Sequence, residues 1–266
     1  DQKQSIFEAI EAQEALAETT PKDARWTIGP SLAPVYFDSF GDGSPIAQNF
    51  VPNSKTGSVN MSYGMSVSYA VNKKLSLRSG VHRVDFGYNT DQVSFSSTLN
   101  ARPSSLIQTI SYSENSKNVV VHSTAGNTPP VPDQTPAADV TAPSPERQGS
   151  MEQEFGYLEV PFEVQYALLD RRFGVNVIGG MSSLFLVDNR VSLNSLGART
   201  EIGEARNINS VNFSGNFGLG FYYNLNPALQ LNMQPMFKYH LNTFSETAGA
   251  FRPFSVGVYS GLSFRF

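Results

Sequence analysis

The sequence contains no cysteine, which excludes disulfides and cysteine-ligated metal sites. Charge is also scarce: charged residues make up 16% of the chain, against about 25% in ordinary soluble domains. The net charge is -4 and no basic cluster occurs, so we expect no nucleic-acid partner. No run approaches the roughly 18 apolar residues of a membrane-spanning helix. Helical membrane spans are therefore not expected.

The first residues differ from the rest of the chain. They read DQKQSIFEAIEAQEALAETTP, a polar and acidic stretch of helix formers that ends at a proline. Because no secretory leader pattern opens the chain, we expect either that a leader has been removed or that this is part of a longer protein. We predict a linker or short helix over residues 1–23 and one domain over residues 24–266.

Beyond residue 24, apolar and polar residues alternate with a period of two, which indicates strands with one apolar face. In SVNMSYGMSVSYAV, for example, Met61 and Met65 share one face and Ser62 lies on the other. The alternation blurs over residues 82–86, where we expect a bulge. The eight alternating segments are 25–37, 58–71, 74–81, 156–168, 173–187, 210–225, 228–241 and 254–266.

Short and long connections alternate strictly between these segments. The short ones lie around residues 72–74, 169–172 and 226–227, and the long ones are 38–57, about 90–152, 188–209 and 242–252. The longest contains GNTPPVPDQTPAADVTAPSPERQGS, which we predict to be exposed and mobile or extended rather than a structured cap. An even strand number with this asymmetry is typical of outer-membrane barrels.

The two faces of the strands differ in a way that favours a membrane barrel over a soluble one. A soluble barrel turns its apolar face inward and needs a charged outer face. Here the polar face is mostly Gly, Ser, Asn and Gln, which suits a narrow lumen, and the apolar face carries hardly a charge. We therefore predict an all-β fold: an eight-stranded antiparallel transmembrane up-and-down β-barrel, with short periplasmic turns, long extracellular loops and both termini periplasmic.

A few charged residues fall on the predicted inward face. Because an unpaired buried charge is very costly, we predict that these residues pair, and that Arg265 reaches Glu159 or Glu163. We interpret them as a structural plug, and the alternative is a proton or ion path. The predicted interior charge network is Arg78, Glu159, Glu163, Lys238 and Arg265.

Aromatic residues near the strand ends are typical of the girdles that barrels place at membrane interfaces. The alternative is that strands simply favour aromatics. We assign this interfacial role to Trp26, Tyr69, Phe173 and Tyr223.

Catalysis is not indicated. The histidines are His82, His122 and His240, two near strand ends and one in a long loop, without the spacing of a triad or a paired-histidine metal motif. His240 near Ser245 and Glu246 is a weak hint of lipid chemistry at an outer rim. We predict a non-enzymatic protein without cofactor or metal.

Several segments together resemble one family. RWTIGPSLAPVYF, VNMSYGMSVSYAVNKKLSLRSGV, GYLEVPFEVQYAL, FGVNVIGG, MFKYHLNTF and VGVYSGLSFRF resemble the outer-membrane β-barrel domain common in Bacteroidota, over about residues 25–266. In longer proteins of this kind, dual membrane-spanning anti-sigma factors, the barrel follows a cytoplasmic region, an inner-membrane helix and a periplasmic linker. The resemblance also implies that Phe266 is a C-terminal signal for the outer-membrane assembly machinery. It supplies no catalytic residues.

These observations lead to a functional hypothesis with two alternatives. We expect a barrel that acts as anchor and sensor of a transenvelope signalling protein. Its partners would be outer-membrane lipid, the assembly machinery and other envelope proteins that contact its loops or its N-terminal tether. The alternatives are a surface-binding or adhesin-like barrel that uses its long loops, and a small porin.

Overall fold

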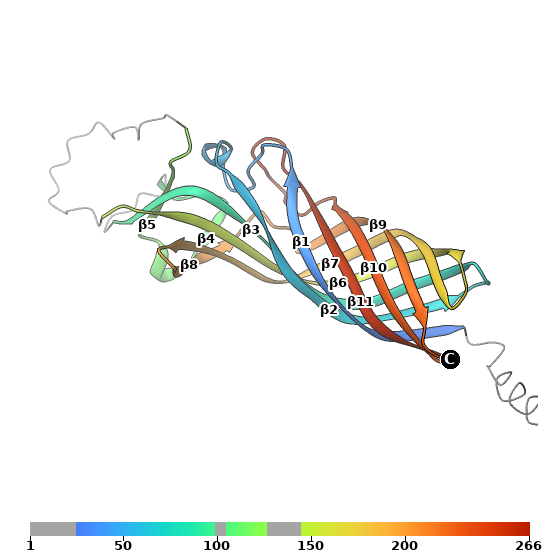
Figure 1. Cartoon of the computed structure of the whole chain (residues 1–266). Helices are drawn as coiled ribbons and strands as arrows, with labels where there is room; N and C mark the ends of the chain where they lie inside the picture. The colour runs from blue at the N-terminus through green and yellow to red at the C-terminus, as the bar shows by residue number, and fades with distance from the viewer. Residues whose placement is uncertain (1–24, 99–104, 127–144) are drawn as a thin grey trace, which may run out of the picture.

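The computed structural model describes residues 25–98, 105–126 and 145–266, and these form one closed antiparallel sheet with an extension at one end (Figure 1). The ring closes where β1 pairs with β11 and where β7 pairs with β9, which confirms the predicted eight-stranded barrel. Its strands in ring order are β1 (Trp26–Phe40), β2 (Lys55–Ala70), β3 (Leu75–Ser97), β6 (Arg147–Leu169), β7 (Phe173–Ser195), β9 (Val211–Asn224), β10 (Leu229–His240) and β11 (Arg252–Arg265).

The start of β1 and the end of β11 lie together at the end of the barrel that carries the short turns (Figure 1). The Trp26 amide donates to the Phe266 carbonyl over 3.0 Å, and the Phe266 amide donates to the Trp26 carbonyl over 2.9 Å. The last strand therefore pairs with the first, which closes the predicted barrel. Closure leaves no free edge within the barrel, as hydrocarbon surroundings require.

The two faces of the barrel strands separate as the alternation predicts. Apolar side chains point outward and stay exposed, among them Phe162 at 65% and Val59 at 64%. Polar side chains such as Ser62 and Asn212 point into the lumen and are fully buried. This inversion of the usual soluble pattern fits a wall in contact with lipid.

The blurred alternation near residues 82–86 has a different cause from the bulge that we expected in this strand. Pairing between β3 and β6 keeps one register from Leu75 to Thr90. The inward face of β3 instead changes from polar to apolar, because Val84, Phe86 and Tyr88 point into an apolar layer of the lumen. A register shift does occur opposite them, but in β2 between Gly57 and Ser62.

The strands β3, β6 and β7 are 23 residues long, about twice the 9–11 residues that cross a bilayer. Their far ends carry the extension, which contains β4 (Ile110–Tyr112), β5 (Val119–Ser123), β8 (Ala198–Ala205) and the short 3-10 helices η1 (Gln48–Phe50) and η3 (Glu114–Ser116). A separate apolar core of residues such as Phe50, Leu193 and Ile202 stabilises it.

The prediction of an exposed and mobile or extended stretch over residues 126–150 is tested only at the two ends of that stretch. Residues 90–97 continue β3, residues 119–123 form β5 against it, and residues 147–152 belong to β6. The described part of the longest connection is therefore folded. Residues 127–144 of the Pro-rich stretch, and the predicted linker over residues 1–23, lie outside the described residues.

Within the described ranges, no helix has the length and apolar character needed to span a membrane.

Candidate functional site in the barrel lumen

The lumen holds the predicted charged residues, and four of the five form two buried ion pairs. Each faces inward because it occupies the polar phase of its strand. Arg78 on β3 pairs with Glu163 on β6, and its Nε donates to Oε2 over 2.7 Å. Arg78 also donates to Gln234 on β10. Glu163 is fully buried, so this pairing satisfies a charge that would otherwise be very costly.

The second ion pair joins β10 to β6. Lys238 Nζ donates to Glu159 Oε1 over 2.5 Å and to the Tyr259 hydroxyl on β11 over 2.9 Å. The ammonium group also lies 4.6 Å from the centre of the Tyr259 ring. Glu159 is 0% exposed and the Lys238 side chain is 6% exposed, so bulk water screens this pair little.

Two neutral side chains join the pairs into one network. Asn216 on β9 donates to Glu163 Oε1 over 2.9 Å and to the Ser182 hydroxyl over 2.6 Å. Ser182 on β7 in turn donates to Glu159 Oε1 over 2.5 Å. The sequence predicts serine and amide side chains in the lumen but no particular role for Asn216, Ser182 or Tyr259. The network thus crosses the lumen from β3 to β11 through six strands.

An aromatic layer lies beside the network, toward the extension. Phe37, Phe86 and Phe155 pack there with ring centroids 4.9 and 6.3 Å from Phe37. His240 belongs to this layer: its ring centroid is 5.0 Å from that of Phe86, and its Nε2 is 3.1 Å from the Ser255 hydroxyl. Together with the ion pairs, this layer fills the lumen here with buried side chains.

This placement overturns the hint of a catalytic rim around His240. His240 is buried inside the barrel, whereas the Ser245 hydroxyl donates to the Asn207 carbonyl in a loop. His82 is also in the lumen, inside β3 rather than near its end, and its Nε2 is 3.1 Å from the Ser66 hydroxyl. In the described ranges, no cluster of His, Asp and Glu is arranged to hold a metal ion.

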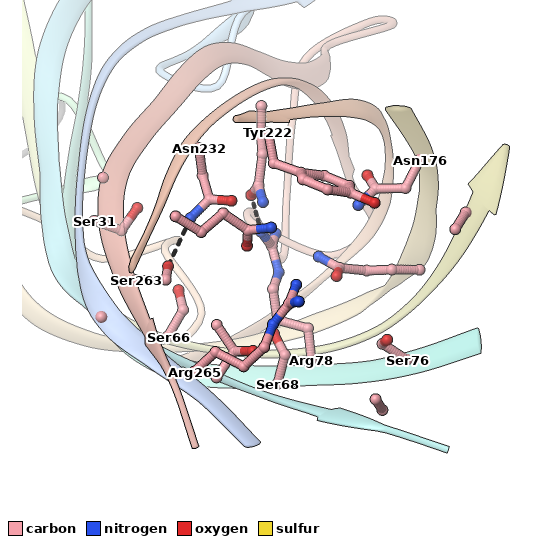
Figure 2. Close-up of a pocket in the computed structure, with 18 of the residues that line it drawn as sticks. Ser31, Ser66, Ser68, Ser76, Arg78, Asn176, Tyr222, Asn232, Ser263 and Arg265 are labelled. Atoms are coloured by element: carbon pink, nitrogen blue, oxygen red, sulfur yellow. Dashed lines mark hydrogen bonds between the residues drawn. The ribbon is translucent and has the colours of Figure 1, made fainter. Parts of the chain in front are cut away.

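On the opposite side of the network, toward the short turns, the lumen opens into a polar cavity of about 220 Å³ (Figure 2). Serines and amides line most of it, including Ser66, Asn176 and Asn232. Arg265 lines this cavity and does not reach a carboxylate of the network, because Glu163 pairs with Arg78 and Glu159 with Lys238. The predicted pairing of Arg265 with these glutamates is therefore wrong.

The four predicted interfacial aromatics form two cross-strand pairs at the short-turn end. Trp26 and Tyr69 are register partners with ring centroids 4.9 Å apart, and Phe173 is the register partner of Tyr223. All four occupy the outward phase of their strands. Their interfacial role remains a prediction, as does the assembly role of Phe266, whose outward side chain is exposed.

A second outward aromatic group, which sequence reasoning missed, lies near the extension. The rings of Phe40 and Phe254 stack with centroids 4.2 Å apart, and Phe237 lies 5.8 Å from Phe254. Cross-strand register brings them together, and this information is absent from any one segment. An apolar band therefore has aromatic groups at both of its ends, as barrel interfaces do.

Charged side chains occur beyond this band, on the surface of the extension. Arg199 of β8 donates to Glu154 of β6 over 2.5 Å, and this hydrogen bond raises the pKa of the guanidinium group. Burial raises the pKa of the Tyr112 hydroxyl, which accepts a hydrogen bond from the Ile107 amide. The extension thus has the paired surface charges and buried core of a water-exposed structure.

A closed barrel with an apolar outer band, aromatic groups at both ends of it and a polar, charged lumen is a transmembrane β-barrel protein. The chain belongs to the family described as outer membrane protein beta-barrel domain, whose model matches residues 24–246. This membership places the protein in the bacterial outer membrane. No curated protein matches the sequence.

Several solved barrels are similar in fold. The outer membrane protein OprG from Pseudomonas aeruginosa has 12% identity and a TM-score of 0.46, with 92% of this chain and 97% of that chain covered. Neisserial surface protein A has 10% identity and a TM-score of 0.45, with 91% and 97% covered. Ail, the attachment invasion locus protein of Yersinia pestis, has 8% identity and a TM-score of 0.40, with 92% and 99% covered.

Proposed function

We propose that this chain is a non-conducting outer-membrane barrel that serves as anchor and sensor of a transenvelope signalling protein of the anti-sigma factor type. The observation that carries the proposal is the filling of the lumen, where a balanced network of two ion pairs lies against an aromatic layer. A barrel built in this way holds a position in the membrane and transports nothing through itself. Its termini and short turns face the periplasm.

The position of the N-terminal segment supports the signalling part of the proposal. Residues 1–24 join the barrel directly at Arg25 and β1, whose first residue is hydrogen-bonded to the C-terminal Phe266. A state sensed by the barrel or its extension passes to this tether, and regulated cleavage of the tether releases a sigma factor.

Removal of the barrel from the full gene product tests this role. Deletion of residues 25–266 in the parent protein is expected to change transcription of the regulated genes under envelope stress. A Phe162→Leu variant, which keeps the outward face apolar, serves as the control. Transcript levels that stay unchanged under every stress applied would refute the signalling role without affecting the assignment as a barrel.

The porin alternative leads to a direct prediction. We expect purified protein in planar lipid bilayers to show no steady channels, because Arg78, Lys238 and the aromatic residues around Phe86 fill the lumen. Liposome-swelling assays with small sugars should likewise give the rate of protein-free vesicles, and a known porin provides the positive control. Large, long-lived conductance steps would contradict the filled lumen.

A surface-binding role is the second candidate, and the folded extension favours it. A hollow of about 470 Å³ lies there, lined by residues that include Ile107, His122 and Glu246. A Glu246→Ala variant alters its rim without touching the apolar core of the extension. An adhesin-like protein would lose attachment to its target surface in this variant, whereas a pure anchor would behave like the wild type.

A further inference from the structure

The polar cavity at the short-turn end has an excess of positive charge. Lys73, Lys74 and Arg265 line it and have no ion-pair partner among the described residues, whereas Asp170 is the one carboxylate in its lining. Arg78 also lines the cavity and is paired with Glu163. The Asp170 carboxylate already accepts a hydrogen bond of 2.7 Å from the Tyr222 hydroxyl. Among the described residues, no carboxylate forms an ion pair with Arg265, which is only partly exposed to solvent.

The geometry concentrates this charge in one place. Arg78 comes from β3 and Arg265 from the end of β11, and Figure 2 shows both side chains reaching into the middle of the lumen. The side-chain amides of Gln230 and Asn232 also line the cavity; each donates one N–H, to Asn224 and to Ser263, and retains a second. Nε and Nη2 of Arg78 contact Glu163 of the ion-pair network, and Nη1 donates to Gln234, which also lines the cavity.

We propose that this cavity is a binding site for an oxyanion, a carboxylate or a phosphate, held between the guanidinium groups of Arg265 and Arg78. A guanidinium group presents a planar fork of donors that matches both kinds of anion. A volume of about 220 Å³ is sufficient, because one water molecule needs roughly 10–15 Å³ on the same measure. The narrow lumen also weakens solvent screening, which strengthens the attraction.

The anion has two possible sources with the same chemistry. One is a small anion from the surrounding solution. The other is the chain itself: residues 1–24 contain six acidic residues and two lysines, and they join the barrel at Arg25, which lines the cavity. Glu18 and Asp23 are the acidic residues closest to that junction in sequence.

Titration of the full-length barrel in a zwitterionic detergent with inorganic phosphate tests the site by calorimetry. Arg265→Gln is the informative variant, because it leaves the Arg78–Glu163 pair intact. It is expected to weaken binding about tenfold, the effect of losing one charge-assisted hydrogen bond. Arg171→Gln is the matched control, since Arg171 is an exposed arginine at the same end that does not line the cavity. Unchanged heat-modifiable gel mobility shows that each variant is folded.

A full-length variant with Glu14→Gln, Glu18→Gln and Asp23→Asn distinguishes the two sources. Binding by the wild type that Arg265→Gln weakens, and that these substitutions leave unchanged, indicates an anion from solution. Binding that appears or tightens only after these substitutions, and is again lost with Arg265→Gln, indicates that the chain's own carboxylates occupy the cavity. If no form binds phosphate, or if Arg265→Gln and Arg171→Gln bind equally, the site does not exist.

Discussion

Replacement of Lys238 by methionine is expected to lower the free energy of unfolding by about 3–5 kcal/mol, the cost of removing one partner from a buried ion pair. Glu159, the partner, is 0% exposed and keeps only the hydroxyl of Ser182 as a close donor in the variant. Methionine has a similar length, so the loss reflects charge rather than a cavity. Equilibrium unfolding by urea in lipid vesicles measures the effect.

Two further variants separate charge from packing. Lys238→Met combined with Glu159→Gln removes both charges and should recover most of the lost free energy, because no unpaired charge remains in the lumen. Lys117→Met is the matched control, since the Lys117–Glu114 pair is at the surface with side chains 56% and 88% exposed. It should change stability by less than about 1 kcal/mol. Equal losses for Lys238→Met and the double variant would show that packing, not charge, is responsible.

The sequence predicts which residues belong to this network better than it predicts which of them pair with one another. Alternation alone places Arg78, Lys238 and the two glutamates on the inward face, because side chains in a strand point to opposite sides in turn. Which cation meets which carboxylate depends on the stagger between strands that are distant in sequence. Arg265 shows this limit: it ends β11 at the mouth of the barrel, whereas Glu159 lies ten residues before the end of β6.

The same limit applies to what the lumen contains along its length. Alternation with a period of two shows which residues share a face. It does not show whether that face is in contact with water, with lipid or with other packed side chains. The inward face of β3 is polar at Arg78 and apolar at Phe86, so the polar and apolar pattern changes although the register of the strand does not. In the extension, short strands such as β4 and β8 pair across about 90 residues of sequence, beyond the reach of local patterns.

The position of the lipid-facing band can be tested at Met65, which is expected to give the second large effect. Met65 lies in the outward phase of β2, is 53% exposed, and has Pro30 on β1 and Val81 on β3 as register partners. It sits between Tyr69 at the short-turn end and the far end of β2. In the hydrocarbon of a bilayer an arginine here has no partner and little water.

Met65→Arg is therefore expected to destabilise the barrel by about 2–4 kcal/mol in phospholipid vesicles, the range for a cation near the bilayer midplane. Leu196→Arg is the control: Leu196 is fully exposed in the turn between β7 and β8, on the extension, where a charge meets water. Folding equilibria of both variants, measured from the intrinsic fluorescence of Trp26, give the comparison. A cost at Met65 no larger than at Leu196 would place this part of the wall in water, and would require another explanation for the exposed apolar face of every strand in the ring.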